Sequence, residues 1–256
     1  MFVLCVANQK GGVGKTATAD ALATFLTRPP FNARVLAIDL DPQCNLTASY
    51  GLNPYEKAVN VRDVLIGNTT AKEAVFKARG AIIRGSMLTS ALDDALKGPA
   101  KHLTLQEALK PLERDFDCVV IDTPPGVALG TTNALFAADA VIIPAAADMF
   151  TLQGVQELLN NVKYVQSHRP GLEVGGIFFT RHNPRSNITQ YAAEKIRELA
   201  GKYNAKVLNA YTRECVAVKE AAALSESIFD YAPKSNAAAD YAAVFNELLE
   251  TKKEGQ

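Results

Sequence analysis

The sequence predicts an α/β fold, with a doubly wound, mostly parallel β-sheet flanked by helices. Three observations lead to this prediction. Short runs rich in Val, Ile and Leu recur along the chain, and each is continuous rather than alternating, as in strands buried on both faces. Helix-like stretches separate these runs. Several runs end in a polar residue or a proline, and ligands bind at the carboxyl ends of parallel strands in open α/β folds.

The predicted strands and helices alternate along the chain. We expect the first helix to start at Lys15 or Thr16 and to stop before Pro29. The more polar region 51–114 shows no clear strand, and we expect a helical and loop insertion there that includes a helix at 103–114. The last clear helix is expected at 237–250, and no linker divides the single domain predicted over 1–256. The predicted strands are 2–7, 35–39, 118–122, 140–144, 176–180 and 206–210.

The composition excludes several classes of protein. Of the 256 residues, 48% are hydrophobic and 21% are charged, which excludes global disorder. The 27 Lys and Arg equal the 27 Asp and Glu, so the surface is not basic everywhere, although a local basic patch stays open. No apolar run approaches the roughly 18 residues of a membrane helix, and the start lacks the basic segment of a signal peptide. Four scattered cysteines predict neither a metal site nor structural disulfides, and indicate a reducing cytoplasm.

The most informative motif is the glycine loop at 10–16, KGGVGKT, between a predicted strand and a predicted helix. Glycines let successive backbone N–H groups point at one anion, and the helix N-terminus adds partial positive charge. In such a loop Lys15 reaches the β- and γ-phosphates, and the Thr16 hydroxyl binds Mg²⁺. Gln9 stands where the ordinary motif has its first glycine, so this loop is a variant with a second lysine, Lys10.

Three acids follow predicted strands. Asp39 and Asp41 close the second run two residues apart, and therefore lie on the same side of the pleat. Asp122 ends another buried run, where an acid can hold a Mg²⁺-bound water. One such aspartate alone is more often a helix cap or a turn residue. Three of them beside a glycine loop that ends in Lys-Thr favour a nucleotide and metal site.

Taken together, these motifs resemble the ParA/MinD family of deviant Walker A ATPases, and most closely its small ParA-type partition ATPases. The resemblance covers nearly the whole chain. KGGVGKT at 10–16 and DLDPQ at 39–43 are specific when found together, and DTPPG at 122–126 resembles the family's switch II. The segments 141–158, 212–221 and 231–249 resemble later parts of the family. The fold that it implies is that of a P-loop NTPase.

The resemblance implies catalytic and nucleotide-binding roles. Lys10 is the signature lysine, which crosses a dimer interface to touch the partner's bound phosphates. Lys15 binds the phosphates within its own chain, and Asp41 orients the attacking water. ATP hydrolysis then depends on dimerisation. The implied ATP-binding residues are Lys10, Gly11, Gly12, Val13, Gly14, Lys15, Thr16 and Ala17.

The resemblance also implies the residues around Mg²⁺. Thr16 binds the metal, Asp39 helps to organise its shell and Asp122 holds a metal-bound water. Asp148 matches an acidic position near the nucleotide and the dimer interface. Cys44 departs from the family pattern, because it stands where the family has glycine. We expect it to alter the flexibility of switch I, with a redox-sensitive thiol as an alternative role.

The second half of the chain carries the features expected for DNA binding. Residues 160–234 contain 11 Lys and Arg against 7 acids. The resemblance places Arg185, Arg213 and Lys219 where DNA-contacting basic residues lie, although a solvated surface remains the simpler interpretation of any one of them. We therefore expect non-specific, salt-dependent DNA binding by an ATP-bound homodimer. The segment 247–256 lacks the basic amphipathic helix of the MinD-like members, so no membrane binding is expected.

The predicted function is that of an ATPase, weak alone and stimulated by partner and DNA. It segregates plasmid or chromosomal DNA with a ParB-like centromere-binding protein, in the cytoplasm and on the nucleoid. Two alternatives stay open: a ParA-like ATPase that positions a protein assembly on the nucleoid, and a nucleotide-gated DNA-binding regulator. A small-molecule ligase or transferase with the same loop is disfavoured, because such enzymes do not need Lys10.

Overall fold

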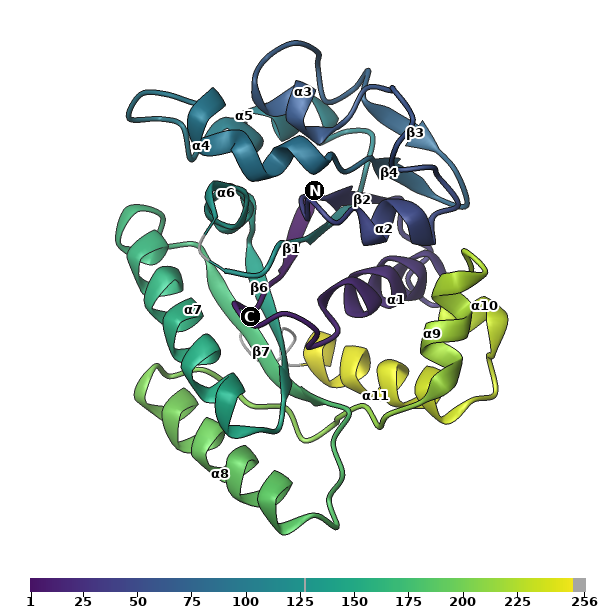
Figure 1. Ribbon diagram of the computed structural model, residues 1–256, viewed down its shortest axis with the longest axis vertical. Helices are drawn as coiled ribbons and strands as arrows, with labels where there is room; N and C mark the ends of the chain where they lie inside the picture. The colour runs from purple at the N-terminus through teal and green to yellow at the C-terminus, as the bar shows by residue number, and fades with distance from the viewer. Residues whose placement is uncertain (127, 251–256) are drawn as a thin grey trace.

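The computed structural model describes residues 1–126 and 128–250, and its centre is one β-sheet (Figure 1). Within the described residues the sheet has seven strands in the order β3-β4-β2-β5-β1-β6-β7. All neighbouring strands are parallel except β3 and β4. The strands are β1 (Phe2–Val6), β2 (Val35–Asp39), β3 (Val75–Lys77), β4 (Ala81–Ile83), β5 (Cys118–Asp122), β6 (Ala140–Ala146) and β7 (Glu173–Thr180). The predicted α/β fold with a mostly parallel sheet is confirmed.

Helices cover both faces of the sheet (Figure 1). One face carries α1 (Lys15–Thr27), α2 (Asn45–Ser49), α9 (Val216–Ala223), α10 (Ile228–Tyr231) and α11 (Asn236–Glu250). The other face carries α3 (Val61–Leu65), α4 (Leu92–Ala95), α5 (Thr104–Leu109), α6 (Leu129–Ala137), α7 (Met149–His168) and α8 (Asn187–Lys202), with 3₁₀ helices at Met87–Ala91 and Lys110–Leu112. Val3 and Cys5 pack into the core on the α5–α8 side, and Leu4 and Val6 into the core beside α1 and α11. Because helices cover both faces of the sheet, the residues of β1 are apolar on both of its sides.

Five of the six predicted strands are confirmed, and the prediction at 206–210 is wrong. Val207 forms an isolated parallel bridge to Ile177 in place of a strand. The backbone N–H groups of Asn209 and Ala210 donate instead to the Glu247 carboxylate of α11, at 2.9 and 2.8 Å. A side chain from a helix therefore takes the place of a neighbouring strand.

The region 51–114 contains short helices and loops, but it also contributes β3 and β4 to the sheet. β4 pairs in parallel with β2, which buries Ile82 and Ile83 completely. The expectation that this region lacks strands is therefore wrong, because three apolar residues are too short a run to distinguish from a loop by pattern. The helix predicted at 103–114 is split into α5 and a 3₁₀ helix.

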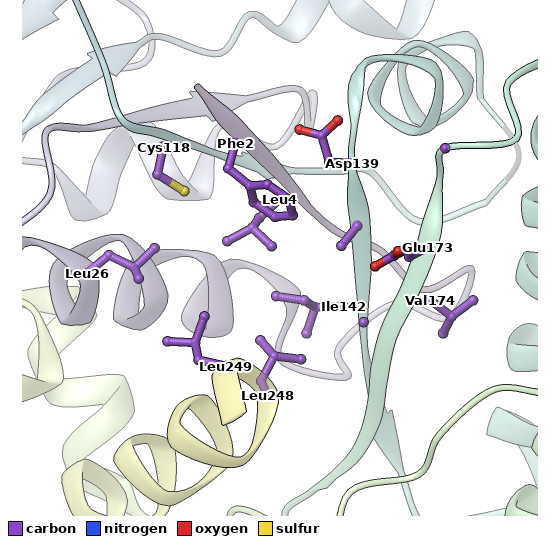
Figure 2. A pocket seen from close by; sticks show the side chains of 13 residues that line it. Phe2, Leu4, Leu26, Cys118, Asp139, Ile142, Glu173, Val174, Leu248 and Leu249 are labelled. Atoms are coloured by element: carbon purple, nitrogen blue, oxygen red, sulfur yellow. The ribbon is translucent and has the colours of Figure 1, made fainter. Parts of the chain in front are cut away.

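The first and last predicted helices are confirmed. α1 ends at Thr27, two residues before Pro29, and α11 covers Asn236–Glu250. Their ends, with β1, β6 and β7, enclose a hollow of about 880 Å³ at the amino edge of the sheet (Figure 2). Its lining includes Leu4, Leu26 and Leu248. No helix within 1–126 or 128–250 has both the length and the hydrophobicity needed to cross a membrane.

Candidate functional site

The glycine loop joins β1 to α1 at the carboxyl edge of the sheet (Figure 1). Gly12 and Gly14 have φ angles of 73° and 87°, in the left-handed region where a side chain is strained. Lys15 and Thr16 open α1 directly after Gly14. Because the N-cap is a glycine without a side chain, the first backbone N–H groups of α1 remain available to an anion. The loop backbone is therefore suited to an anion, and phosphate binding by these residues stays a prediction.

Two residues that the sequence motif did not single out hold this loop in place. Asn8 is buried, donates from Nδ2 to the Pro144 carbonyl at 2.8 Å and accepts a hydrogen bond from the Lys10 N–H at 3.0 Å. The Thr180 hydroxyl, at the end of β7, donates to the Val13 carbonyl at 3.0 Å. A polar residue at a strand end was the signal for Thr180. Asn8 gave no signal, because one polar residue before a glycine loop has many roles.

Lys15 lies over the loop that its backbone helps to form. Its Nζ donates to the Lys10 carbonyl at 3.1 Å, and the residue is only 6% exposed. Burial lowers the pKa of Lys15, while the charges of Asp122 and Asp41 raise it. A buried ammonium group with one carbonyl contact at the mouth of an anion site is suited to binding phosphate oxygens.

Lys10, the second lysine of the loop, is bound by the start of α7. Its Nζ lies 2.7 and 2.6 Å from the two Asp148 carboxylate oxygens and 3.3 Å from the Thr151 hydroxyl. Asp148 also caps α7 by accepting a hydrogen bond from the Thr151 N–H at 2.9 Å. Burial opposes the charge on Asp148, but its hydrogen bonds from Lys10 and Thr151 lower its pKa overall. The structure thus brings Lys10 and Asp148 together, two residues that the resemblance had placed near one interface.

Asp39 and Asp41 both lie buried after β2, but their surroundings differ. Asp39 accepts hydrogen bonds on both carboxylate oxygens, from Thr47 and from the Asp41 N–H. Burial raises the pKa of Asp39 to about 6, although these hydrogen bonds lower it. Asp41 accepts a hydrogen bond from the Gln43 N–H at 2.9 Å. The predicted metal role of Asp39 stays a prediction, since its oxygens are occupied by protein donors here.

Asp122, at the end of β5, has the properties expected of a residue that faces a cation. Its carboxylate oxygens are buried without a hydrogen-bond partner among the described residues. Burial, followed by the charge of Asp39, raises its pKa, although the nearby Thr16 hydroxyl, which makes no hydrogen bond with this carboxylate, and the charge of Lys15 oppose this rise. A buried carboxylate without donors is costly unless a positive charge compensates it.

The donor set at this place fits Mg²⁺. Hydroxyl and carboxylate oxygens are the ligands that Mg²⁺ prefers, and it usually keeps waters and binds substrate phosphates as well. Thr16 would ligate the ion directly and Asp122 would hold one of its waters. Within the described ranges, no cluster of three or more His, Cys, Asp or Glu side chains forms a metal cage of its own. The ion is therefore expected to arrive with a nucleotide.

Cys44 adopts a backbone conformation that favours glycine, the residue that the resemblance places at this position. Its φ of 52° lies in the left-handed region, and the residue is fully buried as the N-cap of α2. Burial, with the charges of Asp39 and Asp41, raises the pKa of its thiol to about 12. A buried thiol with a raised pKa reacts slowly, which argues against the redox-sensitive role.

A pocket of about 170 Å³ extends the glycine loop toward β7 and α9. It is lined on one side by Gly12, Gly14 and Ala17, and on the other by Arg181 and Thr212 among others. The Arg181 guanidinium donates to the Gly12 carbonyl, from a residue with a φ of 50°. The residues that follow β7 and the loop around Thr212 are therefore brought to the glycine loop.

The three predicted DNA-contacting residues have different surroundings. Arg185 is exposed in the turn between β7 and α8. Arg213 is bound in a two-point ion pair with Asp240, at 2.9 and 2.6 Å. Lys219 is exposed on α9, 3.9 Å from Glu214. Arg213 and Lys219 share the pocket beside the glycine loop, and Arg185 is not among its lining residues.

Comparisons with known proteins show which family this chain is similar to. A family model described as an AAA domain matches residues 1–174. The chromosome partitioning protein ParA of Myxococcus xanthus is 30% identical over 252 residues, which cover 96% of this chain and 87% of the relative. The sporulation initiation inhibitor protein Soj of Bacillus subtilis is 30% identical over 251 residues, which cover 96% and 97%.

One similar solved structure contains a nucleotide and a metal ion. The cobyrinic acid a,c-diamide synthase of Mycobacterium smegmatis, solved with ADP and magnesium, has a TM-score of 0.84 and 30% identity. The alignment covers 100% of this chain and 97% of that one. Since the family model covers more than half of the chain and the relatives cover nearly all of it, the chain belongs to the ParA/MinD family of deviant Walker A ATPases.

Proposed function

We propose that this protein hydrolyses ATP with Mg²⁺, forms an ATP-dependent sandwich dimer and binds DNA without sequence preference. With a ParB-like partner it segregates plasmid or chromosomal DNA. One observation carries the proposal: at the carboxyl edge Lys15 lies over a glycine loop with left-handed Gly12 and Gly14, and a second lysine of that loop, Lys10, is paired with Asp148. A phosphate site that served one chain alone would not need this second lysine.

Each residue of the site has a physical task in this proposal. The loop N–H groups and Lys15 bind the phosphates, and Asp41 orients a water for attack. Mg²⁺, held through Thr16 and Asp122, would neutralise the charge that develops on the phosphate oxygens. Phosphoryl transfer involves little covalent chemistry by the protein, so positioning and charge neutralisation account for most of the catalysis.

The ion pair between Lys10 and Asp148 is weak enough for Lys10 to change its binding partner. Their side chains are 30% and 39% exposed, and a pair of this kind contributes only about 0–1 kcal/mol. Lys10 can therefore exchange Asp148 for a partner's phosphates at little cost. A cation supplied in trans acts as arginine fingers do, for which rate increases of about 10³–10⁵ are typical.

Dimerisation also supports the proposed DNA binding. A chain with zero net charge and a modest basic excess in one region binds DNA weakly by itself. Two such surfaces in one dimer act as a bivalent site, so affinity rises without any new contact. ATP then controls DNA binding through assembly, and salt weakens it through the phosphate contacts.

The test compares Lys10→Ala with the wild type by light scattering after size exclusion, in apo, ADP and ATP states with and without DNA. We expect the variant to bind ATP as a monomer but to lose ATP-driven dimerisation and turnover. Lys110→Ala is the matched control, because it removes a lysine from a surface ion pair with Glu107. Unchanged turnover in Lys10→Ala would rule out the role in trans.

A second variant tests DNA binding separately. Arg185→Glu should weaken binding to duplexes of unrelated sequence and reduce its salt dependence, while basal ATP hydrolysis stays unchanged. Wild-type DNA affinity in this variant would place the DNA surface elsewhere.

The choice of partner separates the alternatives. Stimulation of turnover by a ParB-like protein with its DNA site supports partition, whereas stimulation by a protein assembly supports the positioning function. DNA binding that responds to ATP without any turnover supports a regulator.

A further inference from the structure

A buried series of hydrogen bonds lies beneath switch I, the segment around Cys44 that follows β2. The centre of this series is Thr47 of α2. The Thr47 hydroxyl donates to Asp39 Oδ2 at 2.7 Å and accepts a hydrogen bond from the Gly85 N–H at 2.8 Å. The Thr47 backbone N–H donates to the same Asp39 oxygen at 2.8 Å. Thr47 and Asp39 are both completely buried, so no water competes for these contacts. Such a bond is stronger inside a protein than at its surface.

The other oxygen of the same carboxylate reaches Asp41. The Asp41 N–H donates to Asp39 Oδ1 at 3.1 Å. Thr47 and Asp41 therefore hold opposite oxygens of one carboxylate, and a carboxylate held at both oxygens cannot rotate freely. The Thr47 hydroxyl and the Asp41 backbone are thus linked through one carboxylate, although no hydrogen bond joins them directly among the described residues.

Gly85, two residues after the end of β4, is the donor at the other end of this series of hydrogen bonds. A Cβ at this position would lie 2.9 Å from the Asp39 carboxyl carbon and 3.0 Å from Cys44 Sγ. No side chain fits there without displacing switch I. The absence of a side chain lets the Gly85 backbone approach Thr47 closely enough to donate its N–H.

The region 53–61 holds Gly85 in place through its neighbour, Arg84. The Arg84 side chain is buried, and its guanidinium donates to the Asn53 carbonyl at 2.6 Å and to Glu56 at 3.1 Å. The Val61 N–H donates to the Arg84 carbonyl at 2.8 Å. The polar region between β2 and β5 therefore holds the backbone of Arg84 and Gly85, and Gly85 in turn contacts Thr47.

We propose that Thr47 is a positioning residue for ATP hydrolysis, which acts through Asp39 on the backbone of Asp41, and that Gly85 anchors it. This inference rests on the proposed ATPase function. It assigns a role in the reaction to the region 51–114, which contributes none of the phosphate-binding residues. Thr47 touches neither the phosphate loop nor the metal residue Asp122 in the described hydrogen bonds, so its loss should affect turnover more than nucleotide binding.

The test uses four variants of the full chain. Thr47→Val removes the hydroxyl and keeps the shape, Thr47→Ser keeps the hydroxyl, and Gly85→Ala places a Cβ against Asp39. Thr89→Val is the matched control, because Thr89 is a buried threonine of the same region whose hydroxyl donates to the Ser86 carbonyl at 2.7 Å. Steady-state turnover with Mg²⁺ and ATP is measured beside the affinity for a non-hydrolysable ATP analogue.

We expect Thr47→Val and Gly85→Ala to lower kcat at least tenfold while the analogue's Kd changes by no more than about threefold. Thr47→Ser should restore kcat to within about threefold of the wild type, and Thr89→Val should leave it unchanged. If Thr47→Val is too unstable to assay, kcat and the analogue's Kd are compared between Gly85→Ala and Thr47→Ser instead. Wild-type kcat in the Val and Ala variants, or equal losses of kcat and affinity, would overturn the proposal.

Amide hydrogen exchange of the apo protein gives a readout that needs no turnover. Thr47→Val should raise exchange in peptides that cover 39–47 and 83–85, and Thr89→Val, which removes a hydroxyl that contacts Ser86, should not change those peptides. Equal exchange in both variants would count against the chain of contacts. A wild-type protein that binds ATP without hydrolysing it would refute the proposed ATPase instead, so the two failures are distinguishable.

Discussion

The two edges of the central sheet are made by the same strands but have opposite chemistry. At the carboxyl edge, Lys15, Asp39 and Asp122 are buried, and the Asp122 oxygens have no hydrogen-bond partner in the described part of the chain. At the amino edge, apolar side chains surround a hollow (Figure 2). Two acids line this hollow, Asp139 and Glu173, and Asp139 accepts hydrogen bonds from the Val3 N–H and from Arg169, at 2.8 and 2.9 Å.

This difference favours the carboxyl edge as the place of the proposed function. Charges that are buried without partners destabilise a fold, and they persist where a ligand compensates them. The carboxyl edge also carries the left-handed residues Gly12, Gly14 and Cys44, although left-handed residues occur in other parts of the described chain as well. A hollow alone is a weaker indication of function, since apolar hollows need no ligand. Variants at the two edges should therefore respond in opposite ways.

The largest effect is expected for Lys15→Gln at the carboxyl edge. The variant loses a charge-assisted contact to phosphate, so ATP affinity should fall roughly 100-fold, about 3 kcal/mol. Titration calorimetry with Mg²⁺ and a non-hydrolysable ATP analogue measures it. Retained affinity would show that the carboxyl edge is not the nucleotide site.

Leu248→Ala tests the amino edge with the next largest effect. Leu248 is 4% exposed beside the hollow, and its truncation should lower the free energy of unfolding by about 2–4 kcal/mol. Affinity for the ATP analogue should not change, because the side chain lies at the far edge of the sheet. Urea unfolding and calorimetry on one preparation give both values. A loss of affinity without a loss of stability would assign function to the hollow.

Asp122→Asn should stabilise the apo protein, by about 1–2 kcal/mol at pH 8, because it removes a buried charge without donors. The folded pKa of Asp122 is raised, so the carboxyl contributes most to stability below its unfolded pKa and this contribution is lost as pH rises. The advantage of the Asn variant should therefore shrink at pH 5. Urea unfolding at both pH values tests this, and a less stable variant at pH 8 would contradict it. The stabilisation by Mg²⁺ and ATP should be reduced in the variant.

Asp139→Asn is the counterpart at the amino edge and has the smallest expected effect, with the opposite sign. It weakens a partly exposed ion pair and keeps the side-chain shape, so the free energy of unfolding should fall by about 0.5–1 kcal/mol. The same urea experiment measures it. If both Asn variants shift stability in the same direction, the contrast between the two edges is wrong.

The fold and the core of the site follow largely from local pattern. Continuous apolar runs predicted five strands, because a strand covered on both faces is apolar throughout. KGGVGKT could be read from sequence because a phosphate loop needs its glycines and its lysine at fixed spacing. The strand expected at 206–210 failed because Glu247, far along the chain, satisfies its N–H groups.

The sequence by itself therefore determined five strands of the sheet, the glycine loop, its two lysines and the three acids that follow strands, since each depends on residues close together in the chain. Only the tertiary structure decided which side chains hold them. Asp148 binds Lys10 across 138 positions, and Gly85 reaches Thr47 across 38. Contacts of this kind leave no periodic trace in a single sequence. They depend on burial and close approach, which exist only once the chain has folded.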